Sequence, residues 1–310
     1  MRVGLIDVDG HKWPNVALMK LSSWHKSKGD IVEWWWTDMV HYDVVYMSKI
    51  FSDEYTKDAP VPTNADVVIR RGTGYAIDVE NGLEVYHKER DGDLDQEIEN
   101  MIPDYSIYPG LSKDTAYGFL TRGCPRGCPF CHVANKEGKK SCQVAELTDF
   151  WRGQNKIQIM DPNIMACKNR EHLPWDLERS RAHVDFNQGI DVRLCDKDVA
   201  EQLGRIRVKR LHFAWDNPKE DLTSHFEKFA RQYRRKDPAG KSVYVLTNFN
   251  STMEENLWRI ETLRSLGFDP FVMIYRKPSA PQEIRDLQRW CNNKFIFKSC
   301  KWEEYDRKKG

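Results

Sequence analysis

Three cysteines stand close together near the middle of the chain, at Cys124, Cys128 and Cys131. Their spacing is Cys-x3-Cys-x2-Cys, in a short loop that two glycines and two prolines make compact. Three thiolates on one loop can hold three irons of a [4Fe–4S] cubane and leave the fourth iron without a protein ligand. An open metal position is what a substrate needs in order to bind a metal directly. The spacing therefore predicts a cluster that does chemistry, because a fully ligated cluster would suit electron transfer better.

A single zinc ion held by three cysteines and a fourth ligand is the alternative. His132 is present, but it directly follows Cys131, and neighbours in sequence rarely both reach one tetrahedral ion. No second Cys-x2-Cys or His-x3-His pair completes a zinc finger. Cys142 and Cys167 could each supply a fourth thiolate, so a zinc site stays open as an alternative.

A strand leads directly into the cysteine loop. Tyr117–Arg122 is the first of six expected strands in the second half of the chain, and each is followed by a helical pattern. Six parallel strand–helix units need a curved, nearly closed sheet, so we expect a partial (β/α)6 barrel with its site at the carboxyl ends of the strands. The other expected strands are Ile157–Met160, Val184–Asn187, Leu211–Trp215, Val243–Leu246 and Phe271–Tyr275.

Two of the helices in this half have clear end signals. Ser251 and Glu254 predict an N-terminal capping box, and Gly267 with Pro270 predicts the end of that helix. The helix before it is expected to end at residues 237–238, an Asp-Pro pair. These signals mark the fourth and fifth of the six expected strand–helix units.

The first half of the chain predicts a smaller α/β domain. A helix is expected to begin at Pro14, between the first two of several short apolar runs. This order predicts a Rossmann-like domain over residues 1–110 and a second domain over residues 111–310. Residues Val79–Ser112 are acidic and rich in Gly and Pro, and we interpret them as the connection. The expected strands are Val3–Val8, Ile31–Trp36, Asp43–Ser48 and Asp66–Arg70.

The stretch Leu120-Thr-Arg-Gly-Cys-Pro-Arg-Gly-Cys-Pro-Phe-Cys131 resembles the signature of the radical S-adenosylmethionine (SAM) superfamily. The domain order resembles that of its members with an N-terminal cobalamin (B12)-binding-like domain. The resemblance implies a cluster on the three cysteines, SAM on the open iron, and Phe130 packed against the adenine. It implies reductive cleavage of SAM to a 5′-deoxyadenosyl radical that abstracts hydrogen from an unknown substrate. An electron donor such as flavodoxin or ferredoxin is implied too.

Further cofactor-binding residues are expected at the strand ends. Many members of the superfamily hold the SAM amino group with a Gly-Gly-Glu stretch, where this chain has Met160-Asp-Pro-Asn. The resemblance therefore gives this role to Asp161 or Asn163. Arg193 would pair with the SAM carboxylate through its planar fork. Residues of these types can instead cap the next helix. The remaining candidates are Gln188, Asp216 and Asn248.

Cobalamin is possible but not favoured as a further cofactor. Asp9, His11 and Pro14 partly match the Asp-x-His-x-x-Gly pattern of proteins that bind cobalamin through histidine, but the glycine is missing. Residues 72–74, Gly-Thr-Gly, are the small-residue stretch that could admit such a ligand, and bulky Trp13 opposes it in the first loop. Two alternatives to hydrogen abstraction follow. One is a cobalamin-dependent radical SAM methyltransferase, and the other is a non-catalytic zinc- or Fe–S-binding interaction protein.

The composition limits the other classes of function. The 310 residues carry 48 basic and 47 acidic side chains, so the net charge of +1 gives no reason to expect nucleic acid as a partner. No stretch approaches the roughly 18 apolar residues of a membrane span, and the N-terminus does not resemble a signal peptide. We therefore expect a cytoplasmic protein whose thiols stay reduced unless they bind metal.

Overall fold

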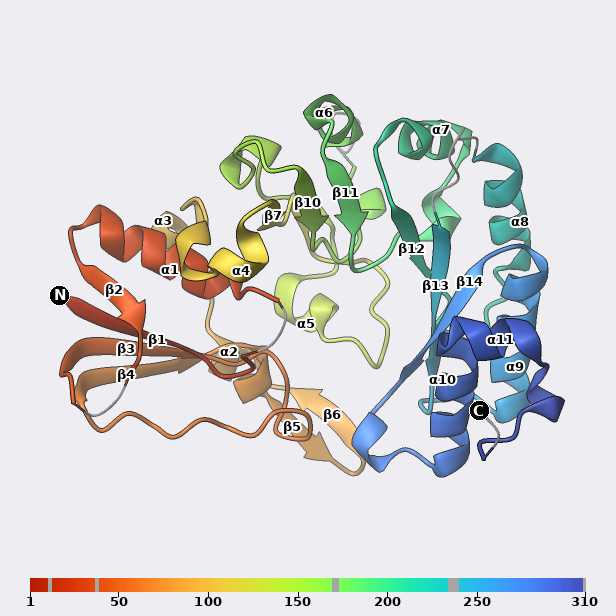
Figure 1. Ribbon diagram of the computed structural model, residues 1–310, viewed down its shortest axis with the longest axis horizontal. Helices are drawn as coiled ribbons and strands as arrows, with labels where there is room; N and C mark the ends of the chain where they lie inside the picture. Colours follow the sequence, from red (N-terminus) through yellow and green to blue (C-terminus); the bar gives the residue numbers. More distant parts are fainter. Residues whose placement is uncertain (11–12, 37–38, 169–172, 234–239, 309–310) are drawn as a thin grey trace.

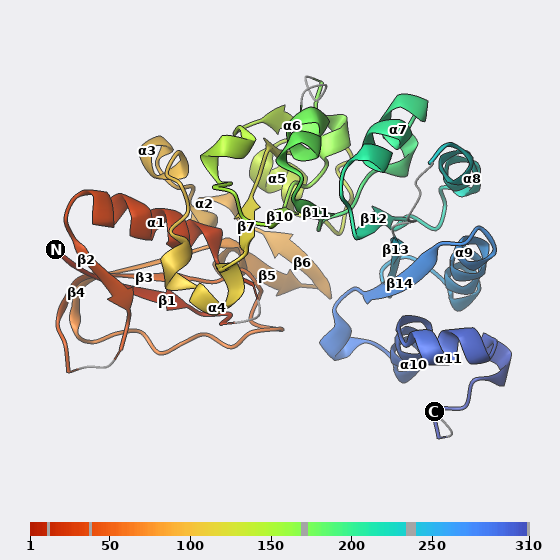
Figure 2. The same ribbon diagram turned by 45° about the horizontal axis from the view of Figure 1, so that its top comes forward.

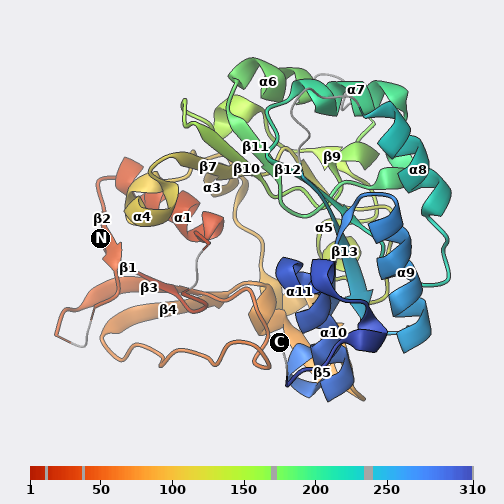
Figure 3. The same ribbon diagram turned by 45° about the vertical axis from the view of Figure 1, so that its right-hand side comes forward.

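The computed structural model describes residues 1–10, 13–36, 39–168, 173–233 and 240–308. It is an α/β protein with several parallel sheets, and its first sheet lies beside a curved row of further strands (Figures 1 and 3). His11 and the helix end expected at residues 237–238 lie outside the described residues. Within the described ranges, no helix is long and apolar enough to cross a membrane.

The first sheet has Rossmann-like elements. Its order is β2-β1-β3-β4, and all its strands are parallel. Helix α1 (Val16–Ser27) connects β1 to β2, and the Asn15 side chain caps it by accepting from the Leu18 amide. The opposite face carries Tyr42, Val45 and Met47, which pack against side chains from connecting segments. The strands are β1 (Arg2–Asp7), β2 (Ile31–Trp34), β3 (Tyr42–Ser48) and β4 (Ala65–Arg71).

The acidic segment after this sheet is more ordered than the sequence suggested. It begins with a hairpin of β5 (Ile77–Glu80) and β6 (Leu83–Tyr86). Ile98 then packs into the same core as Leu18 of α1, so the segment is part of the folded body. Apolar residues alternate with acidic ones along the hairpin, and the high charge hid this period of two. Short helices complete the segment: α2 (Lys88–Asp91), α3 (Gln96–Glu99) and α4 (Pro109–Ser112).

The second half contains two parallel three-stranded sheets, β11-β10-β7 and β12-β13-β14. Isolated parallel bridges, Val184 with Val208 and Ile190 with Phe213, join one sheet to the other. The strands are β7 (Thr115–Gly118), β10 (Lys156–Ile159), β11 (His183–Phe186), β12 (Arg210–Ala214), β13 (Gly240–Thr247) and β14 (Asp269–Ile274).

Helices lie along the outer side of this row of strands (Figure 2). Ile157, Val184, Phe213 and Val243 are almost completely buried in one large core with residues of these helices. Because side chains alternate along a strand, the residues between them point to the inner face. The helices are α6 (Leu173–Ser180), α7 (Lys197–Arg205), α8 (Thr223–Gln232), α9 (Met253–Ser265), α10 (Gln282–Asn292) and α11 (Lys294–Ser299).

Two expectations need correction. The strand expected over Tyr117–Arg122 breaks after Gly118, and Thr121–Arg122 forms a separate strand β8 that pairs antiparallel with β9 (Cys142–Gln143). The cause is the Asp161 carboxylate, which accepts from the Leu120 amide at 2.8 Å and the Thr121 amide at 2.6 Å. These two amides are thereby drawn away from the sheet.

The capping box of α9 is shifted by one residue from the expected pair. Thr252 accepts from the Glu255 amide at 3.2 Å, and the Glu255 carboxylate accepts from the Thr252 amide at 2.9 Å. Ser-Thr and Glu-Glu stand next to each other in this sequence, so both registers fit the motif. The backbone geometry at the end of β13 selects the later one.

A buried arginine fixes the ends of two strands. Arg259 of α9 is completely buried and donates to the carbonyl oxygens of Trp215 at 2.7 Å and Leu246 at 2.9 Å. It also donates to Asn256 Oδ1 at 2.7 Å. Burial lowers the pKa of Arg259 to about 10, so the side chain stays charged at neutral pH. Arg259 thus binds the carboxyl ends of β12 and β13 from the side of helix α9.

The Gly-Thr-Gly loop after β4 packs tightly on the loop after β3. A Cβ on Gly74 would lie 2.3 Å from the Phe51 carbonyl oxygen, and one on Gly72 would lie 2.3 Å from the Lys49 carbonyl oxygen. Gly72 also has a φ of +115°, which side chains rarely tolerate. These glycines are needed for contact between two backbone segments.

Gly74→Ala should therefore destabilise the protein by about 2–3 kcal/mol, because the new methyl group meets backbone that cannot turn aside. The matched control is Gly110→Ala in α4, where no atom lies within 4 Å of the added Cβ. That change should stay within about 0.5 kcal/mol of wild type or stabilise the helix slightly. Urea unfolding measures both. Equal effects of the two substitutions would contradict this packing.

Candidate metal centre

The cysteine loop lies between β8 and the short helix α5 (Val133–Glu137), and its three thiols are partly buried. Glu137 closes the loop: its carboxylate accepts from Arg122 Nη1 at 2.7 Å and from the Gly123 amide at 3.0 Å. Gly123 has a φ of +87°, and a Cβ there would lie 2.2 Å from the Lys140 carbonyl oxygen. A glycine is therefore required just before Cys124.

The three sulfur atoms do not form one compact group. In the part of the chain that the structure describes, the sulfurs of Cys124, Cys128 and Cys131 are not all within 4.8 Å of one another. Tetrahedral zinc with Zn–S bonds of about 2.3 Å would hold all three about 3.8 Å apart. A cubane holds its thiolates farther apart, because each binds a different iron.

The remaining zinc candidates do not join the three cysteines. His132 turns toward the first half of the chain, where its ring stacks on Tyr86 and its Nε2 lies 3.4 Å from Glu84 Oε2. Cys142 is exposed on β9, and Cys167 is buried. In the part of the chain that the structure describes, no close group of metal-ligand atoms includes any of these three.

Asp161 and Asn163, the two candidates after β10, have different environments. The Asp161 carboxylate accepts from two backbone amides and from Thr121 Oγ1 at 2.7 Å. Burial raises the pKa of Asp161 to about 6, although these donors oppose the shift. The oxygens of Asp161 are therefore already used as acceptors for the backbone and side chain of the segment Leu120–Thr121.

Asn163 lies beside the cysteine loop and is 4% exposed. Its Nδ2 is 3.7 Å from Cys124 Sγ and 3.4 Å from Asp191 Oδ2. Its Oδ1 is buried and has no hydrogen-bond partner among the described residues. Buried amide oxygens are normally satisfied. Asn163 therefore presents a buried acceptor next to the cysteine loop.

Asp191 links the cysteine loop to the loop after β11. Its carboxylate accepts from Arg126 Nε at 2.6 Å and from Arg193 Nε at 2.7 Å. Burial alone would raise the pKa of Asp191, but these two guanidinium groups outweigh it and hold the pKa below its usual range. Arg193 also donates to Glu220 Oε2 at 2.7 Å. Neither Arg126 nor Glu220 was predicted from the sequence, because Arg126 occupies a variable position of the cysteine motif and Glu220 belongs to no motif.

Asp216 follows β12 and acts electrostatically on the cysteines. Burial raises the pKa of Asp216 to about 6, and the positive charge of Arg259 opposes this. Burial also raises the pKa of Cys128 to about 11, and the charges of Cys131 and Asp216 add to the shift. The thiols of Cys128 and Cys131 and the carboxylate of Asp216 therefore lie in one region that is partly shielded from water.

The three remaining candidates lie on loops at the same ends of the strands. Phe130 packs edge-on against Phe249, with ring centroids 5.6 Å apart. Asn248 has a φ of +63° and donates to the Tyr275 carbonyl oxygen at 2.8 Å, so its amide holds its own turn. Gln188 is exposed in the turn after β11. Phe130 thus belongs to the cysteine site, whereas Asn248 and Gln188 have no shown contact with it.

The first half of the chain contacts the cysteine site. Lys136 of α5 donates to Thr73 Oγ1 and pairs with Asp91 Oδ2, both at 2.6 Å. The hairpin contributes Glu84, whose amide donates to Tyr275 Oη at 3.0 Å after β14. The Gly-Thr-Gly loop therefore faces α5 on one side and packs against the backbone of Lys49 and Phe51 on the other.

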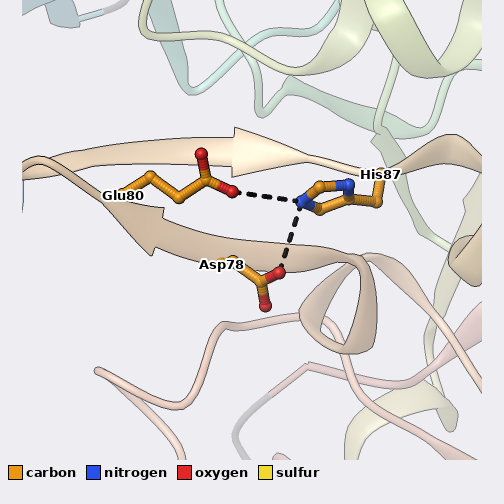
Figure 4. Close-up of side chains that lie close together, drawn as sticks. All are labelled: Asp78, Glu80 and His87. Atoms are coloured by element: carbon orange, nitrogen blue, oxygen red, sulfur yellow. Dashed lines mark ion pairs between the residues drawn. The ribbon is translucent and has the colours of Figure 1, made fainter.

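Another group of possible ligands lies on the hairpin (Figure 4). His87 Nε2 is 3.2 Å from Asp78 Oδ2 and 3.8 Å from Glu80 Oε1. Arg90 already donates to Asp78 Oδ2 at 2.7 Å, and both carboxylates are exposed. Asp78 and Glu80 also lie on the hairpin face opposite to Glu84. We assign no metal to this group, because a positive side chain already balances the carboxylate.

No protein-family model matches the chain, and no curated protein matches its sequence.

The raised pKa of Cys128 predicts its reactivity in metal-free protein. Only the thiolate form of a cysteine reacts with iodoacetamide. Because the pKa of Cys128 is raised to about 11, the thiolate fraction of Cys128 keeps growing with pH up to that value. Alkylation of Cys128 should therefore accelerate about tenfold per pH unit between pH 8 and 10. Mass spectrometry of the labelled peptide measures the rate, with exposed Cys142 as the internal reference. A rate that levels off below pH 9 would show that Cys128 is not buried as described.

Proposed function

We propose that this protein is a radical SAM enzyme with a [4Fe–4S] cluster on Cys124, Cys128 and Cys131. The observation that carries the proposal is the position of these thiols: three on one loop, at Cys-x3-Cys-x2-Cys spacing, beside the carboxyl ends of parallel strands. Two sheets joined by isolated bridges support the finer proposal that the row of strands is a partial (β/α)6 barrel.

When bound, the cluster and SAM supply reductive cleavage of the sulfonium and a 5′-deoxyadenosyl radical that abstracts hydrogen. The chain's own residues hold and orient these groups. Asn163 Oδ1, a buried acceptor without a partner, accepts an N–H from the SAM amino group. Phe130 and Phe249 offer an apolar surface for the adenine. Asp161 holds the backbone before the cysteine loop and is not assigned to SAM.

Arg193 is assigned to the SAM carboxylate. Its Nε is committed to the buried carboxylate of Asp191, whereas its Nη1 donates to Glu220, whose side chain is 38% exposed. A carboxylate of the cofactor replaces the exposed partner more easily than the buried one. Asp191 thus keeps the guanidinium aligned while the ligand displaces Glu220.

Cobalamin is not proposed as a cofactor. Lys49 and Phe51 fill the space beside Gly72 and Gly74, the stretch that could have admitted a large ring. Direct hydrogen abstraction is therefore preferred to methyl transfer through cobalt. The first half of the chain is proposed instead to form one wall of the site, through Glu84, which contacts Tyr275, and Thr73, which contacts Lys136 of α5.

Anaerobic reconstitution should load about four irons and four sulfides per chain. Cys124→Ala, Cys128→Ala or Cys131→Ala should each abolish this loading, because each removes one iron ligand. Cys142→Ala is the matched control and should retain it, since this exposed thiol lies outside the group. Iron and acid-labile sulfide assays measure the result. Stoichiometric zinc without sulfide would refute the proposal.

Reduced, loaded protein should release 5′-deoxyadenosine and methionine from SAM. Asn163→Leu should raise the KM for SAM about tenfold or more with the cluster intact, because it removes a buried hydrogen bond to a charged group. Asn155→Leu, at the opposite and exposed end of β10, should not change KM. Chromatography of the products measures both. Release of 5′-deoxyadenosine no faster than in Cys124→Ala would count against SAM cleavage.

A further inference from the structure

The inner face of the parallel strands carries polar side chains below the cysteine loop. Ile157 and Ile159 of β10 are buried against the helices, so Gln158 between them points to the inner face. The same alternation places Asp185 of β11 and His212 of β12 on this face. Tyr244 of β13 follows in the next strand. These four residues come from neighbouring strands of the row.

Three of these side chains form a chain of polar contacts. His212 Nδ1 lies 2.9 Å from Tyr244 Oη, and the two rings are stacked with centroids 5.4 Å apart. Tyr244 Oη donates to the Asn187 carbonyl oxygen at 3.2 Å. On the other side of the ring, His212 Nε2 lies 3.5 Å from Asp185 Oδ1, beyond ordinary hydrogen-bond distance. The contacts therefore weaken toward Asp185.

Two buried polar atoms at this point have no hydrogen-bond partner among the described residues. One is Nε2 of Gln158, whose side chain belongs to a residue that is 7% exposed, and the other is Oδ1 of Asp185. Gln158 and Asp185 are direct partners in the pairing of β10 with β11. An unpaired buried donor and acceptor side by side are costly, and native proteins retain few of them.

The surroundings favour a neutral, flat ligand. Burial lowers the pKa of His212 and raises that of Tyr244 to about 12, so both rings are uncharged at neutral pH. Phe271 of β14 packs edge-on against Tyr244 with centroids 6.0 Å apart. The Asp185 side chain is 43% exposed, which shows that solvent reaches this face. Aromatic rings beside a few placed polar atoms are typical of sites for planar small molecules.

We propose that Gln158 and Asp185 bind a ligand through an amide-type edge, as a lactam ring or a carboxamide presents it. Gln158 Nε2 donates to the ligand's carbonyl oxygen, and the Asp185 carboxylate accepts from the adjacent ligand N–H. His212 and Tyr244 lie beside this edge and offer ring surface. The bound ligand gives a substrate class for the proposed function. Binding of the ligand does not depend on that function, but its identification as the substrate does.

Uracil is a direct probe of this edge, and metal-free protein is sufficient for the test. Millimolar uracil should shift the NMR signals of the His212 imidazole and the Gln158 side-chain amide. 1,3-Dimethyluracil keeps the carbonyl groups but has no N–H, so it should bind at least tenfold more weakly. Because no cluster or SAM is present, failure of the radical chemistry leaves this result unaffected.

Two variants separate binding from folding. Gln158→Leu removes an unpaired buried amide, so it should unfold at the same or a higher temperature while weakening uracil at least tenfold. Asp185→Asn keeps the shape of the side chain and should weaken uracil similarly. His183→Gln, two residues earlier on the same strand face and exposed, is the matched control and should bind as wild type. Absence of shifts with uracil, equal shifts with dimethyluracil, or unchanged binding in Gln158→Leu would each overturn the proposal.

Discussion

The carboxylate of Asp161 determines where the first strand of the second half ends. It accepts from the Leu120 and Thr121 amides, and so holds the backbone just after the last residue of β7 that pairs with β10. The chain then turns into β8, which pairs with β9 and closes the cysteine loop between them. A buried carboxylate with three donors is a stable local structure, because the donors replace lost water. The position of all three thiols depends on this interaction.

Arg259 has the corresponding role on the opposite part of the row. It donates to carbonyl oxygens at the ends of β12 and β13, and buried carbonyl groups need such donors. Its charge also lies near Asp216, so a carboxylate can stay buried beside the thiols. Together Asp161 and Arg259 hold the irregular backbone on which the site is built. Both are internal, and solvent does not compete for their hydrogen bonds.

The order of strands and helices in the second half was predictable, because alternating apolar runs and helical patterns mark each unit. The break after Gly118 was not, since it depends on Asp161, which is distant in sequence. The cysteine spacing predicted candidate ligands without help from the structure, because it is local in the sequence. The free Oδ1 of Asn163 and the role of Asp191 could not be predicted, because they depend on which polar atoms meet after folding. The acidic hairpin was missed because its charge masked a short alternating pattern.

The hairpin has a consequence for how related chains could diversify. It touches the loop after the first strand of the row through Glu84 and His132, and the end of the last strand through Tyr275. Arg276 adds a bond to the carbonyl oxygen of Gly82 at 2.8 Å, at the tip of the ribbon. No hydrophobic core cluster among the described residues includes β5 or β6. Insertions at this tip would therefore leave the packing of the core intact while changing the surface beside Tyr275 and Arg276. The length of the hairpin can thus vary in evolution without a cost in stability.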